Sequence, residues 1–138
     1  MIRKGTAHWE SNLNEVKGSF SKARNILKQT DYSFKTRLKD GTPETNPAEL
    51  LASAHAGCFT MAVASMLTQR NIRQASLDTE AAITMEGLNI TNIHLSITGL
   101  IKDITADNFN AIIKDAEKNC LISKVLNISI TSEAHLKG

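Results

Sequence analysis

The sequence predicts an α+β fold, and three patterns carry that prediction. Alternating apolar segments come in neighbouring pairs separated by turn residues, which is typical of antiparallel hairpins. A long run of small and apolar residues lies between two such groups and has the character of a buried helix. A second, amphipathic helical pattern comes before the last alternating segment. We therefore expect antiparallel sheets around a central buried helix rather than a doubly wound parallel sheet.

The N-terminal part is predicted to contribute strands. Asn12–Asn14 has the composition of a turn, so the two segments beside it are expected to pair as a hairpin. Asp40-Gly41 lies in a predicted loop, Lys39–Thr45, that leads to the central helix. The expected strands are Ile2–Trp9, Glu15–Ser21 and Tyr32–Leu38.

The central helix is predicted over Asn46–Arg70. Asn46 can cap its N-terminus, and Pro47 suits the first turn. From Leu50 to Gln69 there is no Asp, Glu, Lys or Arg, and a helix without a polar face is buried on all sides. One small sheet covers only one side of such a helix. A second sheet or a second subunit must cover the rest, and a twofold dimer with the helices at its centre would do so.

The C-terminal part is predicted to form a long hairpin, a helix and a final strand. Ala75–Met85 and Ile93–Ile101 alternate on either side of the turn Glu86–Asn89. Thr105 can cap a helix, and Leu121–Leu126 has the pattern of a short helical segment. The apolar stripe of the first of these helices is Phe109, Ile112, Ile113 and Ala116, and the closing strand is Asn127–Leu136.

Length and composition exclude several classes of protein. A chain of 138 residues predicts a single domain, residues 1–138. A net charge of +2 and an aromatic content of 4% do not favour a nucleic-acid partner. The N-terminus lacks the apolar run of a signal peptide, so we expect a cytoplasmic protein. Leu50–Gln69 has the length of a membrane span, but its polar residues, among them Ser53 and His55, argue against a membrane partner.

Two cysteines are the first candidates for chemistry. Cys58 lies in the middle of the central helix, and Cys120 follows the second helix, 62 positions later. A free cysteine is most often a small buried apolar residue. If the two thiols approach each other, one can react with an oxidant and the other can resolve the product as a disulfide. The sequence leaves both interpretations open, because it does not give the distance between them.

Arg37 and Glu49 are candidates with ordinary alternatives. Arg37 either lies on a solvated strand face or holds Cys58 as a thiolate and orients an oxygen substrate. Glu49 has the spacing of a capping box with Asn46. Glu49 and Cys58 are nine residues apart. On a straight helix this spacing is a rotation of about 900° and a rise of about 13 Å, so the two side chains point to opposite sides. Glu49 could serve the cysteine of a partner chain instead.

The histidines show no metal-ligand spacing with each other or with the cysteines. His55 is expected to be a packed interface residue. It also lies one helical turn from Cys58, which leaves open a role in tuning that thiol. The chain contains four histidines: His8, His55, His94 and His135.

Four segments together resemble one known family. They are GTAHWE, YSFKTR, TNPAELLASAHAGCFTMAVASML and KNCLISKVL, and the resemblance runs almost from end to end. They are similar to the OsmC/Ohr family, and most of all to its osmotically inducible protein C branch. The resemblance implies an OsmC-like intertwined homodimer with two active sites at the interface. It also implies a cofactor-free enzyme without metal, haem or flavin.

The family's activity is the reduction of organic hydroperoxides, and of hydrogen peroxide less well. By resemblance, Cys58 is the peroxidatic thiolate and becomes a sulfenic acid. Cys120 is then the resolving thiol, which closes an intrachain disulfide, and Arg37 belongs to the active-site network. A dithiol, such as the lipoyl groups of a carrier protein, is implied as the reductant.

Two positions depart from the family pattern. The family commonly has Glu directly after the Pro of its NPxEL motif, and here that position is Ala48, so Glu49 is the only carboxylate nearby. Leu121 follows Cys120 where the family usually has Pro. A weakened polar network would suit an alternative function, a non-catalytic dimeric module of the same fold that binds a small apolar molecule. A redox sensor that passes its disulfide to another protein is a further alternative.

Overall fold

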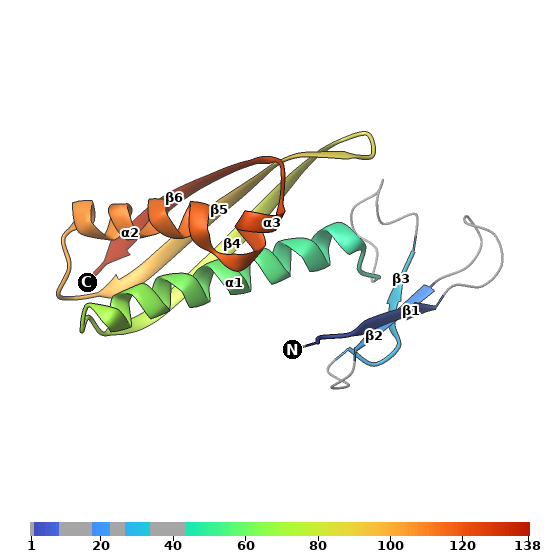
Figure 1. Cartoon of the computed structure of the whole chain (residues 1–138), viewed down its shortest axis with the longest axis horizontal. Helices are drawn as coiled ribbons and strands as arrows, with labels where there is room; N and C mark the ends of the chain where they lie inside the picture. Colours follow the sequence, from blue (N-terminus) through green and yellow to red (C-terminus); the bar gives the residue numbers. More distant parts are fainter. Residues whose placement is uncertain (1, 9–17, 23–26, 34–43) are drawn as a thin grey trace. The chain divides into compact units, whose positions relative to one another are not determined.

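The structure is a computed structural model that describes residues 2–8, 18–22, 27–33 and 44–138. The chain divides into two compact units, Met1–Leu50 and Leu51–Gly138. The first unit contains a three-stranded antiparallel sheet in the order β1-β2-β3 (Figure 1). Its strands are β1 (Gly5–His8), β2 (Gly18–Lys22) and β3 (Thr30–Tyr32).

The predicted N-terminal hairpin is confirmed, because β1 pairs antiparallel with β2. Within the described residues, the predicted third strand Tyr32–Leu38 overlaps β3 at Tyr32. Residues 34–43 lie outside the described residues. Thr45 then returns to β3, where it forms a parallel bridge with Tyr32 and its N–H donates to the carbonyl of Asp31 at 3.1 Å.

The central helix α1 spans Pro47–Gln69, close to the predicted bounds. Asn46 caps it, because its Oδ1 accepts from the N–H of Glu49 at 2.9 Å. The helix ends at Gln69, and Asn71, two residues later, has a φ of 56°, the left-handed conformation typical of the residue after a helix. Its fully buried residues lie on one stripe at every fourth position: His55, Phe59, Val63 and Leu67.

The expectation that α1 is buried on all sides is therefore wrong for the isolated chain. Met61, on another face, is 74% exposed. The physical reason is that the sheet of the second unit, on which the helix packs, covers a single stripe of it. By length and apolar composition, α1 is a helix that could cross a membrane, but it packs on the sheet as a core helix.

The sheet of the second unit is mixed, which corrects the expectation of antiparallel sheets. It has the order β4-β5-β6, and β4 and β5 form the predicted antiparallel hairpin. β5 and β6 are parallel. The chain between them runs through two helices, and such a crossover returns the next strand to the same end of the sheet. The elements are β4 (Gln74–Glu86), β5 (Asn89–Ile101), α2 (Ala106–Asn119), α3 (Leu121–Val125) and β6 (Ser129–Lys137).

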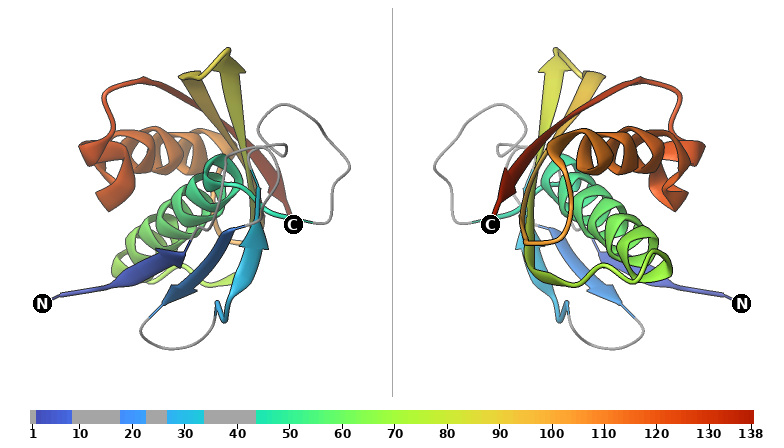
Figure 2. Two further views of the ribbon diagram at one scale, coloured as in Figure 1. Left: turned by 90° about the vertical axis from the view of Figure 1, so that its right-hand side faces the viewer. Right: turned by 90° about the vertical axis from the view of Figure 1, so that its left-hand side faces the viewer.

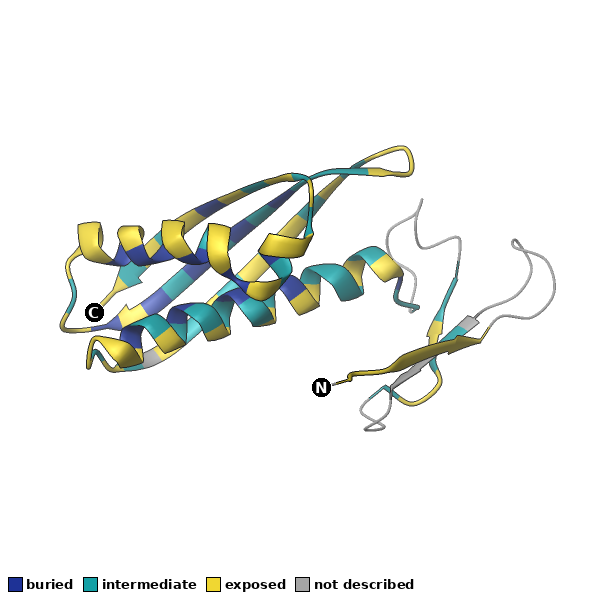
Figure 3. Ribbon diagram, viewed as in Figure 1, coloured by how far each residue is buried: buried dark blue, intermediate teal, exposed yellow. Residues whose placement is uncertain are grey.

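Both long helices cover the same face of this sheet, as the two side views show (Figure 2). Buried residues line the side of each helix that faces the strands, and exposed residues line the opposite side (Figure 3). Thr60 of α1 also lies 2.7 Å from Thr79 of β4, Oγ1 to Oγ1. The core comprises Phe59, Val63, Leu67, Ile93, Leu95, Ile97, Ile101, Phe109, Ile112, Ile113, Ala116 and Cys120. The predicted apolar stripes of β5 and α2 are thus confirmed.

Candidate active site

Cys58 lies on α1 at the edge of this core. Its side chain is partly buried and packs against the core cluster. Its position follows from the helix, because it comes one residue before the fully buried Phe59 and so lies beside the buried stripe rather than on it. The thiol is free and partly accessible, as a reactive cysteine must be.

Cys120 is buried and lies at the junction of two helices. It is 2% exposed, follows the last residue of α2 and caps the N-terminus of α3. Its Sγ accepts from the N–H of Ser123 at 3.4 Å and lies 3.0 Å from the Ser123 Oγ. Cys120 belongs to the same core cluster against which Cys58 packs. The fold therefore brings both cysteines to one core, although they are 62 positions apart in the sequence.

His55 and Ser123 extend the contacts of Cys120 towards α1. The Nε2 of His55 lies 2.8 Å from the Ser123 Oγ, and both side chains are buried. The Nδ1 of His55 is buried without a hydrogen-bond partner among the described residues. Burial lowers the pKa of His55 below its ordinary value of 6.5, because desolvation disfavours the charged imidazolium.

Sequence reasoning expected His55 to be a packed residue and overlooked Ser123. The available signal was the three-residue spacing from Cys120 to Ser123 at the start of a helical segment. This is the spacing of a cap, in which the first side chain accepts from the third N–H of the helix.

Glu49 is engaged at the start of α1. It is exposed, and its Oε2 accepts from the Oγ1 of Thr45 at 3.0 Å. Its N–H makes the predicted bond with Asn46. The helix is continuous from Glu49 to Cys58, so helical geometry keeps their side chains on opposite sides. Ala48, beside it, is partly buried. Arg37 lies outside the described residues, so its role stays a prediction.

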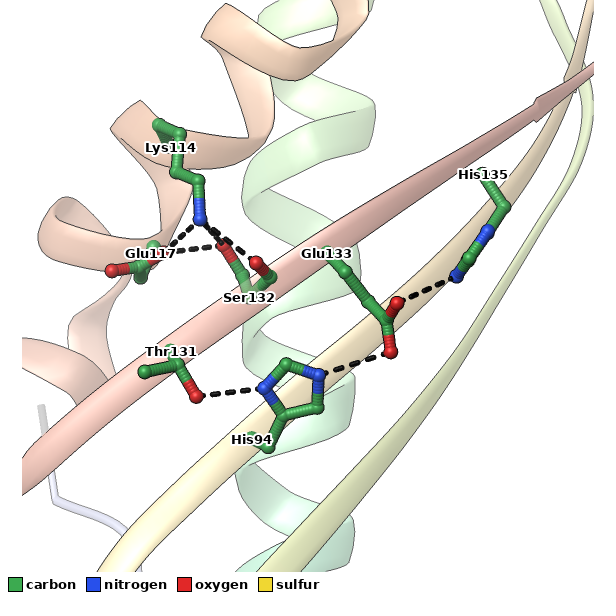
Figure 4. A network of polar contacts seen from close by, with 7 residues as sticks. All are labelled: His94, Lys114, Glu117, Thr131, Ser132, Glu133 and His135. Atoms are coloured by element: carbon green, nitrogen blue, oxygen red, sulfur yellow. Dashed lines mark hydrogen bonds and ion pairs between the residues drawn. The ribbon is translucent and has the colours of Figure 1, made fainter.

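A separate polar network lies on β5, β6 and α2 (Figure 4). On the outer face of the sheet, Glu133 joins the Nε2 of His94 at 3.0 Å and the Nε2 of His135 at 3.1 Å. The hydrogen bond with His94 lowers the pKa of Glu133, and the neighbouring charge of His135 adds to this effect. The carboxylate lies between the two rings, and within the described part of the chain no three His, Cys, Asp or Glu side chains are placed to hold a metal.

On the inner face, the same strand β6 is tied to α2. The Nζ of Lys114 donates to the carbonyl oxygen of Ser132 at 2.8 Å and to the Glu117 Oε2 at 3.2 Å. The hydroxyl of Ser132 also donates to the carboxylate of Glu117 (Figure 4). These contacts hold the helix on the strand, so we assign them a structural role.

Comparison with known proteins places the chain in a family. The family described as "OsmC-like protein" matches residues 39–134, more than half of the chain. "Peroxiredoxin OsmC" of Escherichia coli (strain K12) is 38% identical over 140 residues, which covers 99% of this chain and 97% of that protein. The chain belongs to the OsmC family. The "Uncharacterized protein YmaD" of Bacillus subtilis (strain 168) is a more distant relative, 28% identical over 95% of this chain and 91% of its own length.

Solved structures support an OsmC-like fold. An OsmC-like protein of unknown function from Vibrio cholerae superposes with a TM-score of 0.78 at 11% identity, over 97% of this chain and 99% of the other. A Legionella pneumophila protein described as "an organic hydroperoxide resistance protein OsmC" gives 0.72 at 16% identity, over 100% and 98%. At these identities the likeness concerns the fold alone. It agrees with an α+β OsmC fold in which a long helix packs on a mixed sheet.

Proposed function

We propose that this OsmC family member is a cofactor-free cysteine peroxidase that reduces organic hydroperoxides in the cytoplasm, and hydrogen peroxide less well. The observation that carries the proposal is that both cysteines pack on one core, one partly accessible and the other buried and hydrogen-bonded. The 38% identity with a protein called a peroxiredoxin supports the same reaction class.

The proposed reaction needs two sulfur atoms. The thiolate of Cys58 attacks the terminal peroxide oxygen, the O–O bond breaks, the alcohol leaves, and Cys58 becomes a sulfenic acid. The thiol of Cys120 then attacks the sulfenic sulfur, which forms the Cys58–Cys120 disulfide and releases water. A dithiol, such as the lipoyl group of a carrier protein, reduces the disulfide and is itself oxidised.

A homodimer of single OsmC-like domains would complete this site. The exposed apolar side of α1, marked by Met61, supports a covering second copy. In such a dimer the Glu49 of one chain serves the Cys58 of the other, since helical geometry separates the two within one chain. Arg37 holds the thiolate and orients the peroxide oxygens.

Substitution of each cysteine tests this assignment. The reduced protein is mixed with one equivalent of cumene hydroperoxide, and free thiols and remaining peroxide are measured. The wild type should lose both thiols rapidly. Cys58→Ser should leave the peroxide intact, and Cys120→Ser should consume one equivalent, stop, and over-oxidise with excess peroxide. Full peroxide reduction by Cys58→Ser would refute the proposal.

A second candidate function is favoured by one position. Ala48 removes the carboxylate that the family pattern places after Pro47, and a weaker polar network suits a dimeric module that binds a small apolar molecule. Thiols of the wild type that stay unreactive towards cumene hydroperoxide would favour this module. The kinetics of Glu49→Ala and Ala48→Glu then separate the cases. In a peroxidase the first variant loses activity and the second retains or gains it.

A further inference from the structure

A buried polar chain connects α3 with α1 inside an otherwise apolar core. It runs from the Sγ of Cys120 to the Oγ of Ser123 at 3.0 Å, and from there to the Nε2 of His55 at 2.8 Å. The three side chains are 2%, 7% and 0% exposed. Among the buried residues that the structure describes, His55 and Cys120 are the titratable ones. The serine hydroxyl between them can accept a proton from one side and donate one to the other.

The other ring nitrogen of His55 is the unusual feature. Nδ1 is buried and has no hydrogen-bond partner within the described residues. Buried polar atoms are nearly always paired, because leaving one unpaired costs about 1–3 kcal/mol. Cys58 is three residues further along α1, and residues at that spacing are neighbours on a helix surface. One ring nitrogen of His55, Nε2, thus contacts Ser123, the neighbour of the Cys120 sulfur. The other, Nδ1, is available to a group formed at Cys58.

We propose that Ser123 and His55 form a proton relay for the disulfide step, a proposal that rests on the function proposed above. The Cys120 S–H proton passes to the Ser123 Oγ while the serine proton passes to His55 Nε2. The Cys120 sulfur attacks the Cys58 sulfenic sulfur, the S–S bond forms and the S–O bond breaks. His55 releases its Nδ1 proton to the leaving hydroxide, which departs as water. Cys120 is oxidised, the sulfenic sulfur is reduced, and no further co-reactant is needed.

Burial suits His55 to passing a proton on rather than keeping it. Desolvation lowers the pKa of His55, so burial favours the neutral imidazole over the imidazolium. The buried core residues of β5 and α2 are apolar, so their side chains offer no competing acceptor. A thiol that must attack as a thiolate from a buried position needs such an acceptor, because Cys120 is only 2% exposed and meets little water.

Ser123→Ala is the direct test, with the exposed Ser129→Ala as the matched control. Each reduced protein is mixed rapidly with one equivalent of cumene hydroperoxide. Peroxide consumption reports sulfenic acid formation at Cys58, and loss of the second thiol reports the disulfide step. Ser123→Ala should consume peroxide at the wild-type rate and close the disulfide about 100-fold more slowly, the scale of general acid–base catalysis. Ser123→Thr, which restores a hydroxyl, should recover most of the rate.

The pH profile of the disulfide step distinguishes a relay from a merely structural contact. A displaced Cys120 sulfur would slow the step by the same factor at every pH. Without the relay, hydroxide must remove the proton, so the variant rate should rise about tenfold per pH unit and approach the wild-type rate in alkali. His55→Asn should show the same pH profile as Ser123→Ala, and the exposed His135→Asn serves as its control. Urea unfolding reports whether the His55→Asn protein is folded.

The outcomes separate the two proposals. If the wild type consumes no peroxide, the peroxidase assignment fails and the relay fails with it. If the wild type closes its disulfide and Ser123→Ala does so equally fast, the relay alone is refuted. A slowed step with the wild-type pH profile would likewise refute it, because the contacts would then only position Cys120.

Discussion

Asn46 is the residue that determines where α1 begins. Its Oδ1 accepts from the N–H of Glu49 at 2.9 Å, and its side chain is buried. Asn46→Ala should therefore lower the free energy of unfolding by at least about 1 kcal/mol, measured from the urea midpoint. Asn46→Asp retains the acceptor and should stay close to the wild type. An alanine variant as stable as the wild type would show that Pro47 alone suffices to start the helix.

His55 should make stability depend on pH. Its pKa is lowered by burial, so below about pH 6.5 the unfolded chain binds a proton that the folded chain does not. This contribution to stability is fully present above the unfolded pKa and is lost as the pH falls towards the folded pKa. The urea midpoint should decrease between pH 7.5 and 5.5.

The His55 contribution can be isolated by substitution. His55→Gln should flatten this pH dependence, whereas the exposed His135→Gln should leave the slope due to His55 in place. Equal slopes in the wild type and His55→Gln would contradict the assignment of the pH dependence to this side chain.

At the level of single residues, the sequence predicted what depends on local spacing. Asn46 and Thr105 were recognised as caps because a cap is recognised within four residues. The contact of His55 with Ser123 was not predicted, because its partners are 68 positions apart and depend on how α3 packs on α1. The placement of Cys58 and Cys120 on one core followed from tertiary packing for the same reason.

Among the elements, the close packing of β5 against α2 depends on a glycine, Gly99. A Cβ at Gly99 would lie 2.9 Å from the Cζ of Phe109 and 3.0 Å from the Cδ1 of Ile101. Both neighbours are buried, so neither can move freely. Gly99→Ala should reduce the free energy of unfolding by about 1–3 kcal/mol, measured by urea denaturation.

A double-mutant cycle locates the origin of that loss. Phe109→Leu shortens the side chain that the new methyl group would meet. Gly99→Ala combined with Phe109→Leu should cost less than the sum of the two single substitutions, because part of the clash is removed. Strict additivity would place the strain elsewhere.

The direction of β6 could not be predicted from the sequence pattern, although the strand itself could. Alternation in Asn127–Leu136 correctly predicted a strand, since residues of one parity face the core. Alternation is the same in parallel and antiparallel strands, so it does not reveal the pairing direction. The decisive feature was the crossover through α2 and α3. Similarly, the all-round apolar character of α1 did not reveal that the chain itself buries only one stripe.

For the whole molecule, the exposed side of α1 leads to a prediction about assembly. We expect a dimer at twice the chain mass of 15.1 kDa in sedimentation. Met61→Glu places a charge on the face that a second copy would cover, so this variant should sediment as a monomer. Val125→Glu, at a residue that is equally exposed but lies on α3, should remain dimeric. A monomeric wild type would contradict the proposed homodimer.

The position of β6 in the chain also determines when the core can be completed during synthesis. The strand is made after the other described elements, and α2 gains its polar anchor at Ser132 only after that residue has left the ribosome. Synthesis proceeds from the N-terminus, and chain segments fold in that order where they can. A nascent chain that has just exposed residue 125 already carries both thiols, but its core lacks one wall. An incomplete chain therefore exposes both sulfur atoms to oxidants more than the folded chain does.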